Sequence, residues 1–458
     1  MFFIEAKIKP SVLEAAFIVV MIIAMISIGI GRLGATPHIP ILFAIIFLIF
    51  YGLIKGIRFK TLEESLLSGA KASLGAVYIF LLIGILISSW IVSGTIPTLL
   101  YLGLSIITAS FYYTIVFMIT AIIGTAVGSS LTTVATIGVA FMSIAGAIDA
   151  SIALTAGAIV SGAFFGDKMS PLSDTTNLAA SIVGVDLFEH IKNMSLTTVP
   201  AFVISAILYS VLSPSVETFD ASTIASYKAS LLQTNFIHWY AIVPLLILIA
   251  CTLLKMPAFL TLIVSSLVAL VLSTFHMSLT FADYSAILYN GFVSETGVEV
   301  IDSLLTRGGI SSMYFTIMLV ILSLSMGGLL FALGVIQTLL SKIEKGLRSV
   351  GSLITGTAIT AIGINTLVGE QYLSILLTGE AYKQKYDEQG LHPKNLSRVM
   401  EDAGTVINPL VPWSVCGLFI AEMLDVPVMS YLPFAFFCLL SPLLTILFGW
   451  LNVTITKK

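Results

Sequence analysis

Charged residues are scarce in this chain. Asp, Glu, Lys and Arg make up 10% of its 458 residues, whereas hydrophobic residues make up 58%. Soluble domains carry roughly 25% charged residues, so this composition excludes a water-soluble globular protein. The longest polar stretches, 213–235, 276–302 and 383–398, are loops by length and too short to bury a core of their own. We therefore expect an all-α polytopic membrane protein that forms a single membrane domain, with no soluble domain.

Cysteine and the common catalytic motifs are also scarce or missing. Cys251, Cys416 and Cys438 are odd in number and lack CxxC spacing, which predicts packed thiols without disulfide or metal roles. GxxxxGK[ST], HExxH and GxSxG do not occur, which argues against ATP-driven transport and the commonest membrane hydrolases. The net charge of −3 gives no indication of a nucleic-acid partner. We expect a protein that is not an enzyme and holds no cofactor.

Apolar runs of membrane-spanning length recur along the whole chain. A window of about 19 residues finds about fourteen of them. They lie near residues 12–31, 37–54, 73–100, 111–127, 128–147, 151–183, 195–213, 236–254, 257–275, 310–340, 350–366, 368–381, 399–424 and 427–451. The pairs within 111–147 and 350–381 are short enough to be broken helices or re-entrant hairpins, so about 11–14 transmembrane segments are expected.

The positions of the few basic residues predict an orientation. Lys and Arg gather near both termini and in the loops 55–60, 342–348 and 383–398, and all these clusters fall on one side if every apolar run crosses. Basic loops face the cytoplasm, so both termini are predicted to be cytoplasmic in a multi-pass protein of the cell membrane. The opposite side should carry the acidic residues Asp283, Glu295, Glu299 and Asp302.

The chain also resembles itself. KASLGAVY at 71–78 aligns with RGGISSMY at 307–314, and the equivalent loops differ in charge: 55–60 is basic, but 283–302 is acidic. An odd number of crossings per unit turns the second copy upside down, which produces an inverted-topology repeat. We predict a first repeat at 1–220 and a second at 221–458.

The strongest local signal is the polar sequence GAFFGDKMSPLSDTTNL at 162–178, enclosed between apolar stretches. An ionised Asp at the centre of a membrane helix costs at least about 2.5–3.5 kcal/mol, so Asp167 and Asp174 together indicate a function. Pro171 should break the helix, freeing carbonyls and helix ends to bind a cation. The alternative is that these residues form a polar loop between separate helices.

A second polar stretch, EDAGTVINPLVPWS at 401–414, repeats this design with a predicted break at Pro409. Here Glu401 and Asp402 could instead be the solvated start of a helix. Two more constellations precede the broken segments, at 124–133 and 363–371. Their Gly and hydroxyl residues also suit ordinary helix packing. Glu370 is either a membrane-edge residue or a group that binds a proton when buried without a cation.

These stretches supply the candidate ion- or substrate-binding residues, all of them oxygen donors suited to small hard cations. They are Thr132, Thr133, Asp167, Ser170, Ser173, Asp174, Thr175, Thr176, Asn177, Asn365, Thr366, Glu370, Asp402, Thr405 and Asn408. Within this set, sodium is assigned to Asp174, Thr176, Asn177, Glu370 and Asn408, with Asp174 as the preferred exchanging carboxylate. The five His residues lie at segment ends, where interfacial placement is expected.

GDKMSPLSDTTNLA at 166–179, GEQYLS at 369–374, GLHPKNLSR at 390–398 and EDAGT at 401–405 closely resemble the NhaC family of sodium/proton antiporters. The resemblance runs over nearly the whole chain. It implies an inverted-repeat fold, with sodium bound where broken helices meet, and a family that also includes exchangers of malate and lactate.

The sequence therefore predicts a secondary active transporter that exchanges Na⁺ for H⁺ by alternating access. The alternative is Na⁺- and H⁺-coupled exchange of a small organic ion, such as a carboxylate or an amino acid, whose carboxylate Lys168 or Arg307 would bind. Expected partners are the lipid bilayer, Na⁺ and H⁺, and no nucleic acid. An organic ion and a second copy of the chain are left open.

Overall fold

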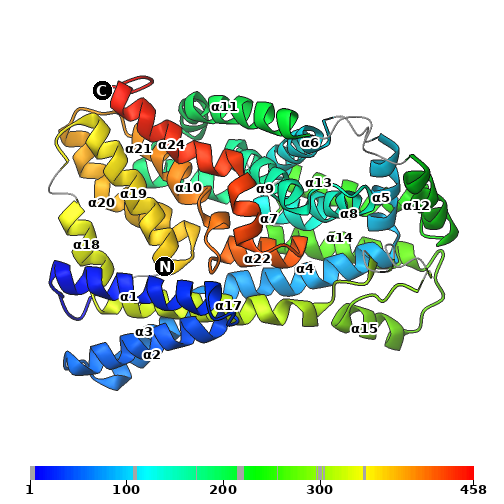
Figure 1. The fold of residues 1–458 in the computed structure, drawn as a ribbon, viewed down its shortest axis with the longest axis horizontal. Helices are drawn as coiled ribbons and strands as arrows, with labels where there is room; N and C mark the ends of the chain where they lie inside the picture. Colours follow the sequence, from blue (N-terminus) through cyan, green and yellow to red (C-terminus); the bar gives the residue numbers. More distant parts are fainter. Residues whose placement is uncertain are drawn as a thin grey trace.

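The computed structural model describes residues 6–106, 111–171, 173–213, 221–254, 256–295, 297, 302, 305–343 and 347–458. Nearly all of these residues form helices or the turns between them, and the helices lie in two layers (Figure 1). This arrangement confirms the all-α fold class. Lys345 and Glu299, assigned above to the basic and acidic loops, lie outside the described residues.

One layer contains long apolar helices that pack mainly on each other: α3 lies against α17 and α4 against α14, while α1 contacts α2 and α18. Its helices are α1 (Val12–Gly31), α2 (His38–Ile54), α3 (Phe59–Ala72), α4 (Leu74–Val92), α5 (Thr95–Ile106), α12 (Ala221–Gln233), η3 (Trp239–Ile242), α13 (Val243–Leu253), α14 (Ala258–Ser273), α15 (Phe281–Asn290), η4 (Ile310–Met313), α17 (Tyr314–Ala332) and α18 (Val335–Ile343). We call this layer the scaffold.

The other layer contains the four stretches with candidate site residues, at 124–133, 162–178, 363–371 and 401–414, and we call it the core layer. Within it α6 packs along α9, α11 along α24, and α19 along α20 and α24. Its helices are α6 (Tyr112–Val127), α7 (Ser130–Thr133), η1 (Val134–Gly138), α8 (Val139–Ala147), α9 (Ile152–Met169), α10 (Asp174–Val183), α11 (Leu187–Leu212), α19 (Val350–Val368), α20 (Gln371–Glu388), α21 (Lys394–Met400), η6 (Glu401–Thr405), η7 (Asn408–Leu410), α22 (Val415–Leu424), α23 (Val428–Tyr431), η8 (Leu432–Phe434) and α24 (Phe436–Leu451).

Two helical hairpins in the core layer turn back within the protein. In the first, the Tyr112 hydroxyl at the start of α6 donates to the Phe141 carbonyl in α8, so the chain returns to the level at which it entered. In the second, the Tyr382 hydroxyl in α20 donates to the Gly356 carbonyl near the start of α19. The first hairpin opens beside the end of α11, where the Ser213 hydroxyl accepts from the Tyr113 amide. The second opens at the other end of the molecule, where Lys383 donates to a carbonyl at the end of α10.

The two hairpin tips have the same backbone design. Gly128 and Gly369 adopt left-handed conformations, with φ of 70° and 74°, which glycine reaches without steric cost. The next residue in each tip, Ser129 or Glu370, caps the returning helix by accepting a backbone N–H three residues on. The helices that follow are also broken alike, between α9 and α10 and between η7 and α22, with Ser173 and Ser414 as caps. These equivalent features in opposite orientations agree with the inverted repeat, while the boundaries 1–220 and 221–458 stay predictions.

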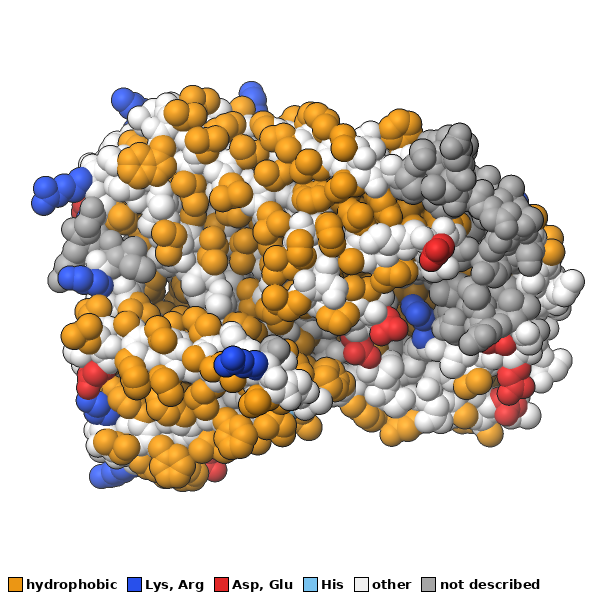
Figure 2. Space-filling model, in the orientation of Figure 1, with side chains coloured by type: hydrophobic (Ala, Val, Ile, Leu, Met, Phe, Trp, Pro, Cys, Tyr) orange, Lys and Arg blue, Asp and Glu red, His pale blue; other side chains and the backbone are white. Residues whose placement is uncertain are grey.

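The surface is that of a membrane protein. Six helices are long and apolar enough to cross a bilayer, two bent helix pairs pass the same test together, and four shorter apolar helices accompany them in the described part of the chain. Hydrophobic side chains cover the middle of the molecule, and most of the visible Lys and Arg side chains lie toward its left end (Figure 2). Lys458 there pairs with Asp387, and residues 7–10 contact the ends of α17 and α18, so both termini lie near the basic end.

Several boundaries differ from the sequence prediction. The stretches 213–235 and 276–302 contain the helices α12 and α15, and α20 continues to Glu388. Hydropathy detects membrane spans and misses polar helices such as α15, whose start is fixed by a capping box between Thr280 and Asp283. Similarly, α11 begins at Leu187 rather than 195 because the Asp186 carboxylate accepts the first free amides of the helix.

The predicted helix breaks are both present, but the second is displaced. Pro171 lies between α9 and α10, as predicted. The second interruption starts after Thr405 and includes Pro412 as well as Pro409, because Pro409 fits the first turn of the short 3₁₀ helix η7. The three cysteines of the chain are buried free thiols, as expected.

Gly162 allows α6 and α9 to lie in close contact. A Cβ at Gly162 would lie 2.6 Å from the Phe117 carbonyl oxygen, whereas a Cβ at Gly363 on α19 would meet no heavy atom within 4 Å. We expect Gly162→Ala to destabilise the protein by about 1–3 kcal/mol, since the backbone has to shift. The matched control, Gly363→Ala, should leave stability unchanged or raise it by up to about 1 kcal/mol through helix propensity. Thermal melting of both variants in detergent checks this, and equal melting temperatures would contradict the close-packing account.

Candidate functional site

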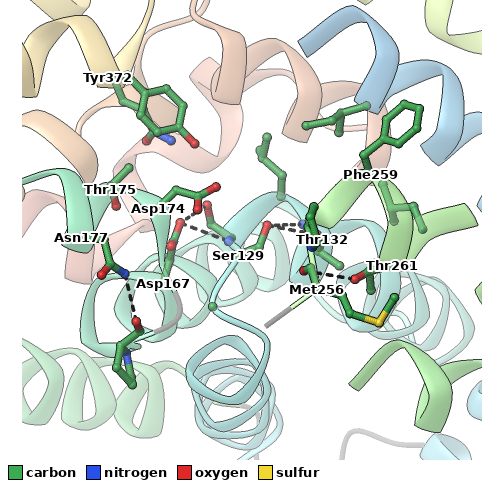
Figure 3. A pocket seen from close by; sticks show the side chains of 18 of the residues that line it. Ser129, Thr132, Asp167, Asp174, Thr175, Asn177, Met256, Phe259, Thr261 and Tyr372 are labelled. Atoms are coloured by element: carbon green, nitrogen blue, oxygen red, sulfur yellow. Dashed lines mark hydrogen bonds between the residues drawn. The ribbon is translucent and has the colours of Figure 1, made fainter. Parts of the chain in front are cut away.

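A cavity of about 660 Å³ lies between the two layers. The core layer contributes the first hairpin tip, the break between α9 and α10, and Gln371 and Tyr372 of the second hairpin. The scaffold contributes the start of α14 and Ile79 of α4. Asp167 and Asp174 lie together on one side of it, and Met256, Phe259 and Thr261 lie on the other (Figure 3). The broken helices therefore place polar groups inside the protein at the boundary between its two layers.

Asp167 ties the first hairpin tip to the end of α9. One carboxylate oxygen accepts from both the amide and the hydroxyl of Ser130, at 3.1 and 2.6 Å, and the side chain is 5% exposed. Ser130 is the first residue of the returning helix, so the carboxylate also faces a helix N-terminus, where partial positive charge stabilises it. Asp167 also lines the cavity.

Asp174 presents a second carboxylate to the same cavity. It is the first residue of α10, held in place because the Ser173 hydroxyl caps the helix. Asn177 fixes the broken segment by donating to the Pro171 and Ser173 carbonyls, at 2.9 and 2.7 Å. Asp174 is exposed to the cavity, and the described structure gives its carboxylate no hydrogen-bond donor. It is thus the more accessible of the two acids.

The charged side chains that line the described cavity are all acidic. Among the described residues that line it, Asp167 and Asp174 are acidic and none is Lys, Arg or His. Hydroxyl and amide groups of Ser129, Thr132 and Asn177 add further oxygens. Such a lining attracts a cation and repels an anion, and its hard oxygen ligands suit an alkali-metal ion.

Glu370 lies in a smaller compartment that adjoins the main cavity. This compartment measures about 370 Å³, is lined mostly by apolar side chains such as Phe80 and Leu324, and shares Gln371 and Tyr372 with the main cavity. Glu370 caps α20 by accepting from the Leu373 amide at 2.8 Å. It is the counterpart of Ser129 and extends the acidic lining toward the second hairpin tip.

Asn365 and Asn408 form a polar bridge in the second unit. The Asn408 amide donates to the Asn365 side-chain oxygen at 2.8 Å, and the Asn365 amide donates to the Gly404 carbonyl at 2.5 Å. The Asn408 oxygen accepts the Cys416 amide at 3.0 Å, which ties η7 to the start of α22. Both asparagines are fully buried, so their hydrogen bonds fix the conformation of the break between η7 and α22.

Lys168 points away from the cavity, although it follows Asp167 directly. Its ammonium group pairs with Asp402 of η6 and donates to the Ser441 hydroxyl at 2.9 Å, and both members of the ion pair are fully buried. Asp402 also accepts from Ser441 and from Thr197, at 3.0 and 2.8 Å. This pair joins α9, η6, α11 and α24.

The structure brings only part of the predicted site together. Five predicted residues line the main cavity: Thr132, Asp167, Asp174, Thr175 and Asn177. Glu370 lines the adjoining compartment. Nine lie elsewhere, in capping, helix-internal or buried contacts: Thr133, Ser170, Ser173, Thr176, Asn365, Thr366, Asp402, Thr405 and Asn408. Of the assigned sodium ligands, Thr176 donates to the Lys168 carbonyl at 3.1 Å and Asn408 bonds to Asn365. The ligand assignments stay predictions.

Sequence reasoning missed several lining residues. Ser129, Ser130, Gln371 and Tyr372 all follow the two tip glycines, and this common position was the signal that could have identified them. Met256 and Thr261 gave no such signal, because Thr261 belongs to the apolar run 257–275 and Met256 directly precedes it. His190 was expected at the interface, but it is fully buried and its Nδ1 lies 2.8 Å from the Ser397 hydroxyl. Its helix begins about two turns earlier than hydropathy indicates and packs on α21.

Two inverted units, with hairpin tips and helix breaks around a polar cavity in an apolar protein, define a secondary transporter. Comparison with known proteins is in agreement: the model of the Na⁺/H⁺ antiporter family matches residues 162–453. The chain belongs to the Na⁺/H⁺ antiporter family.

The relatives of this chain are named as antiporters of different substrates. It is 42% identical to the Na⁺/H⁺ antiporter NhaC of Alkalihalophilus pseudofirmus, over 96% of this chain and 95% of that one. It is 34% identical to the arginine/ornithine antiporter ArcD of Halobacterium salinarum, over 96% and 92%. It is 35% identical to the malate-2H⁺/Na⁺-lactate antiporter of Bacillus subtilis, over 90% and 89%. Family membership therefore leaves the cargo to be argued from the cavity.

Proposed function

We propose that this protein exchanges Na⁺ for H⁺ across the cell membrane. The observation that carries the proposal is a cavity with two carboxylates, Asp167 and Asp174, and no basic side chain among its described lining residues. A relative that is 42% identical over nearly the whole chain is named as a Na⁺/H⁺ antiporter, which supports the same cargo.

Competition for carboxylate oxygens would couple the two ions. Removing water from a carboxylate is costly, so a buried carboxylate without a basic partner needs either a metal cation or a proton. Sodium at Asp167 and Asp174 would therefore displace protons, and protons would release sodium. The protein would then change its orientation with either sodium or protons bound at these carboxylates. This alternation would couple the movement of the two ions.

The position of the cavity suits alternating access. It lies where the core layer meets α4 and α14 of the scaffold, so movement of one layer relative to the other would expose it to each side in turn. The basic ends of the helices would face the cytoplasm, and both termini with them.

A cationic organic cargo is the second candidate. The cavity of about 660 Å³ could hold many waters, each of which takes about 30 Å³ of liquid, so it has room for an amino acid. The relative named as an arginine/ornithine antiporter supports this alternative. An organic acid is disfavoured, because Lys168 is already paired with Asp402 and the main cavity's described lining includes no Arg307.

Proton flux in vesicles tests the cargo. Purified protein is reconstituted with an internal pH indicator, and NaCl, LiCl, KCl, arginine, ornithine, malate or lactate is added in turn. We expect sodium to move protons without any organic solute, and malate and lactate to have no effect of their own. A response that requires arginine or ornithine would replace sodium by an organic cation as cargo, and a strict requirement for malate or lactate would contradict the electrostatic argument.

A further inference from the structure

Glu401 is an acidic residue buried outside the cavity. It lies in η6, is 0% exposed, and neither of its carboxylate oxygens has a hydrogen-bond partner of normal geometry. Thr405 contacts it one turn on, but the Thr405 hydroxyl is likewise without a partner. An ionised carboxylate in such a place would lack the hydrogen-bond donors that normally stabilise its charge.

The neighbouring residue, Asp402, is a buried carboxylate that does have stabilising partners. Asp402 is equally buried, yet it accepts from Lys168, Ser441 and Thr197. One acid in η6 thus has an ammonium ion and two hydroxyl donors, and the next has none. Asp402 therefore has the donors that a buried carboxylate requires, and Glu401 does not.

Charge balance leads to the same conclusion. The charged groups that interact with Glu401 are Lys168, Asp167 and Asp402. One ammonium group cannot neutralise three carboxylates, and Asp402 already takes it. Other buried titratable side chains on elements packed against η6 or beside it are Tyr382, Tyr386, Cys438, Arg398 and His190. Arg398 directs its Nη1 to Thr454, and its Nε and Nη2, although buried without a partner, make no hydrogen bond to Glu401.

We propose that Glu401 is a second proton-binding site, placed in η6 outside the main cavity. This proposal rests on the sodium/proton exchange proposed above. When Na⁺ binds at Asp167, the Glu401 carboxylic acid loses its O–H proton to solution and becomes a carboxylate. When Na⁺ leaves, the carboxylate takes a proton back. Loss of the Glu401 proton then offsets the positive charge that Na⁺ brings to the cluster, which limits the uncompensated charge in the membrane interior.

Proton release on sodium binding tests this assignment. Purified protein in weak buffer with a pH indicator is titrated with NaCl, and bound sodium is counted in parallel with radioactive Na⁺ at several pH values. Glu401→Gln should still bind sodium but should release about one proton fewer per sodium than the natural protein, since metal binding and proton loss are linked. Glu401→Asp should restore the release, and Glu422→Gln, a half-buried glutamate in α22 outside the cavity, should not change it.

The outcomes separate the two proposals. If the natural protein binds sodium and releases no protons, the proposed exchange itself fails. If it releases protons and Glu401→Gln releases as many per sodium, Glu401 is not a proton site. Glutamine has the shape of the protonated acid, so the variant should fold with an unchanged melting temperature. Should it fail to fold, infrared difference spectra of the natural protein with and without sodium decide: the band of a buried protonated carboxyl group should disappear with sodium, and its persistence would overturn the proposal.

Discussion

Asp167→Asn is expected to reduce sodium-driven proton flux by about 100-fold, equivalent to roughly 3 kcal/mol at 1.4 kcal/mol per factor of ten. Asparagine has nearly the same shape, and its side-chain oxygen can still accept from the Ser130 amide and hydroxyl. The hairpin tip should therefore keep its position while the charge that binds the cation is lost. Flux is measured in reconstituted vesicles, with sodium binding measured on the same preparation.

Asp149→Asn is the matched control for this change. Asp149 is an exposed aspartate in a turn of the same unit, with a φ of 53° that asparagine also tolerates. Its flux should stay within about twofold of the natural protein, as expected of a surface substitution. Equal flux in Asp167→Asn and Asp149→Asn would exclude Asp167 from the cation site.

The largest loss of stability is expected from breaking the Lys168–Asp402 ion pair. Lys168→Met leaves Asp402 as a buried charge without its ammonium partner, and Asp402→Asn does the same to Lys168. Removing one member of a buried pair typically costs about 3–5 kcal/mol. The double variant removes both charges and keeps an oxygen that accepts from Thr197 and Ser441, so it should be more stable than either single variant. Thermal melting in detergent measures the order of stability among the natural protein, the two single variants and the double variant.

The exposed pair between Lys55 and Glu14 provides the comparison. Its N–O distance is 2.5 Å, and the side chains are 36% and 39% exposed. Pairs of this kind contribute about 0–1 kcal/mol, so Lys55→Met should melt close to the natural protein. If Lys168→Met melts as Lys55→Met does, the buried pair does not join the core layer as described here.

Much of the architecture could be predicted from sequence because it depends on local chemistry. Hydropathy revealed the membrane segments, and Pro171 marked the first helix break. The pairs of short apolar runs at 111–147 and 350–381 correspond to the two hairpins. The acidic residues near Pro171 line the cavity for the same reason: a broken helix exposes its polar neighbours.

Contacts between segments that are distant in the sequence could not be predicted from local patterns. Asp167 and Lys168 are adjacent in sequence, yet one faces the cavity and the other pairs with a residue of the opposite unit. Glu401 and Asp402 carry the same chemical group, and only Asp402 accepts from donors contributed by α9, α11 and α24. Such differences depend on tertiary packing, which local patterns do not encode.

The central claim is that carboxylates of the cavity bind sodium in competition with protons. The most direct test is the sodium affinity of the purified protein as a function of pH, measured with radioactive Na⁺ for the natural protein and for Asp174→Asn. The account predicts that the apparent Kd for sodium rises at least about tenfold for each unit by which the pH falls, while the competing carboxylates become protonated. Asp174→Asn should bind sodium much more weakly at every pH. A sodium affinity that is independent of pH, or one that Asp174→Asn leaves intact, would contradict it.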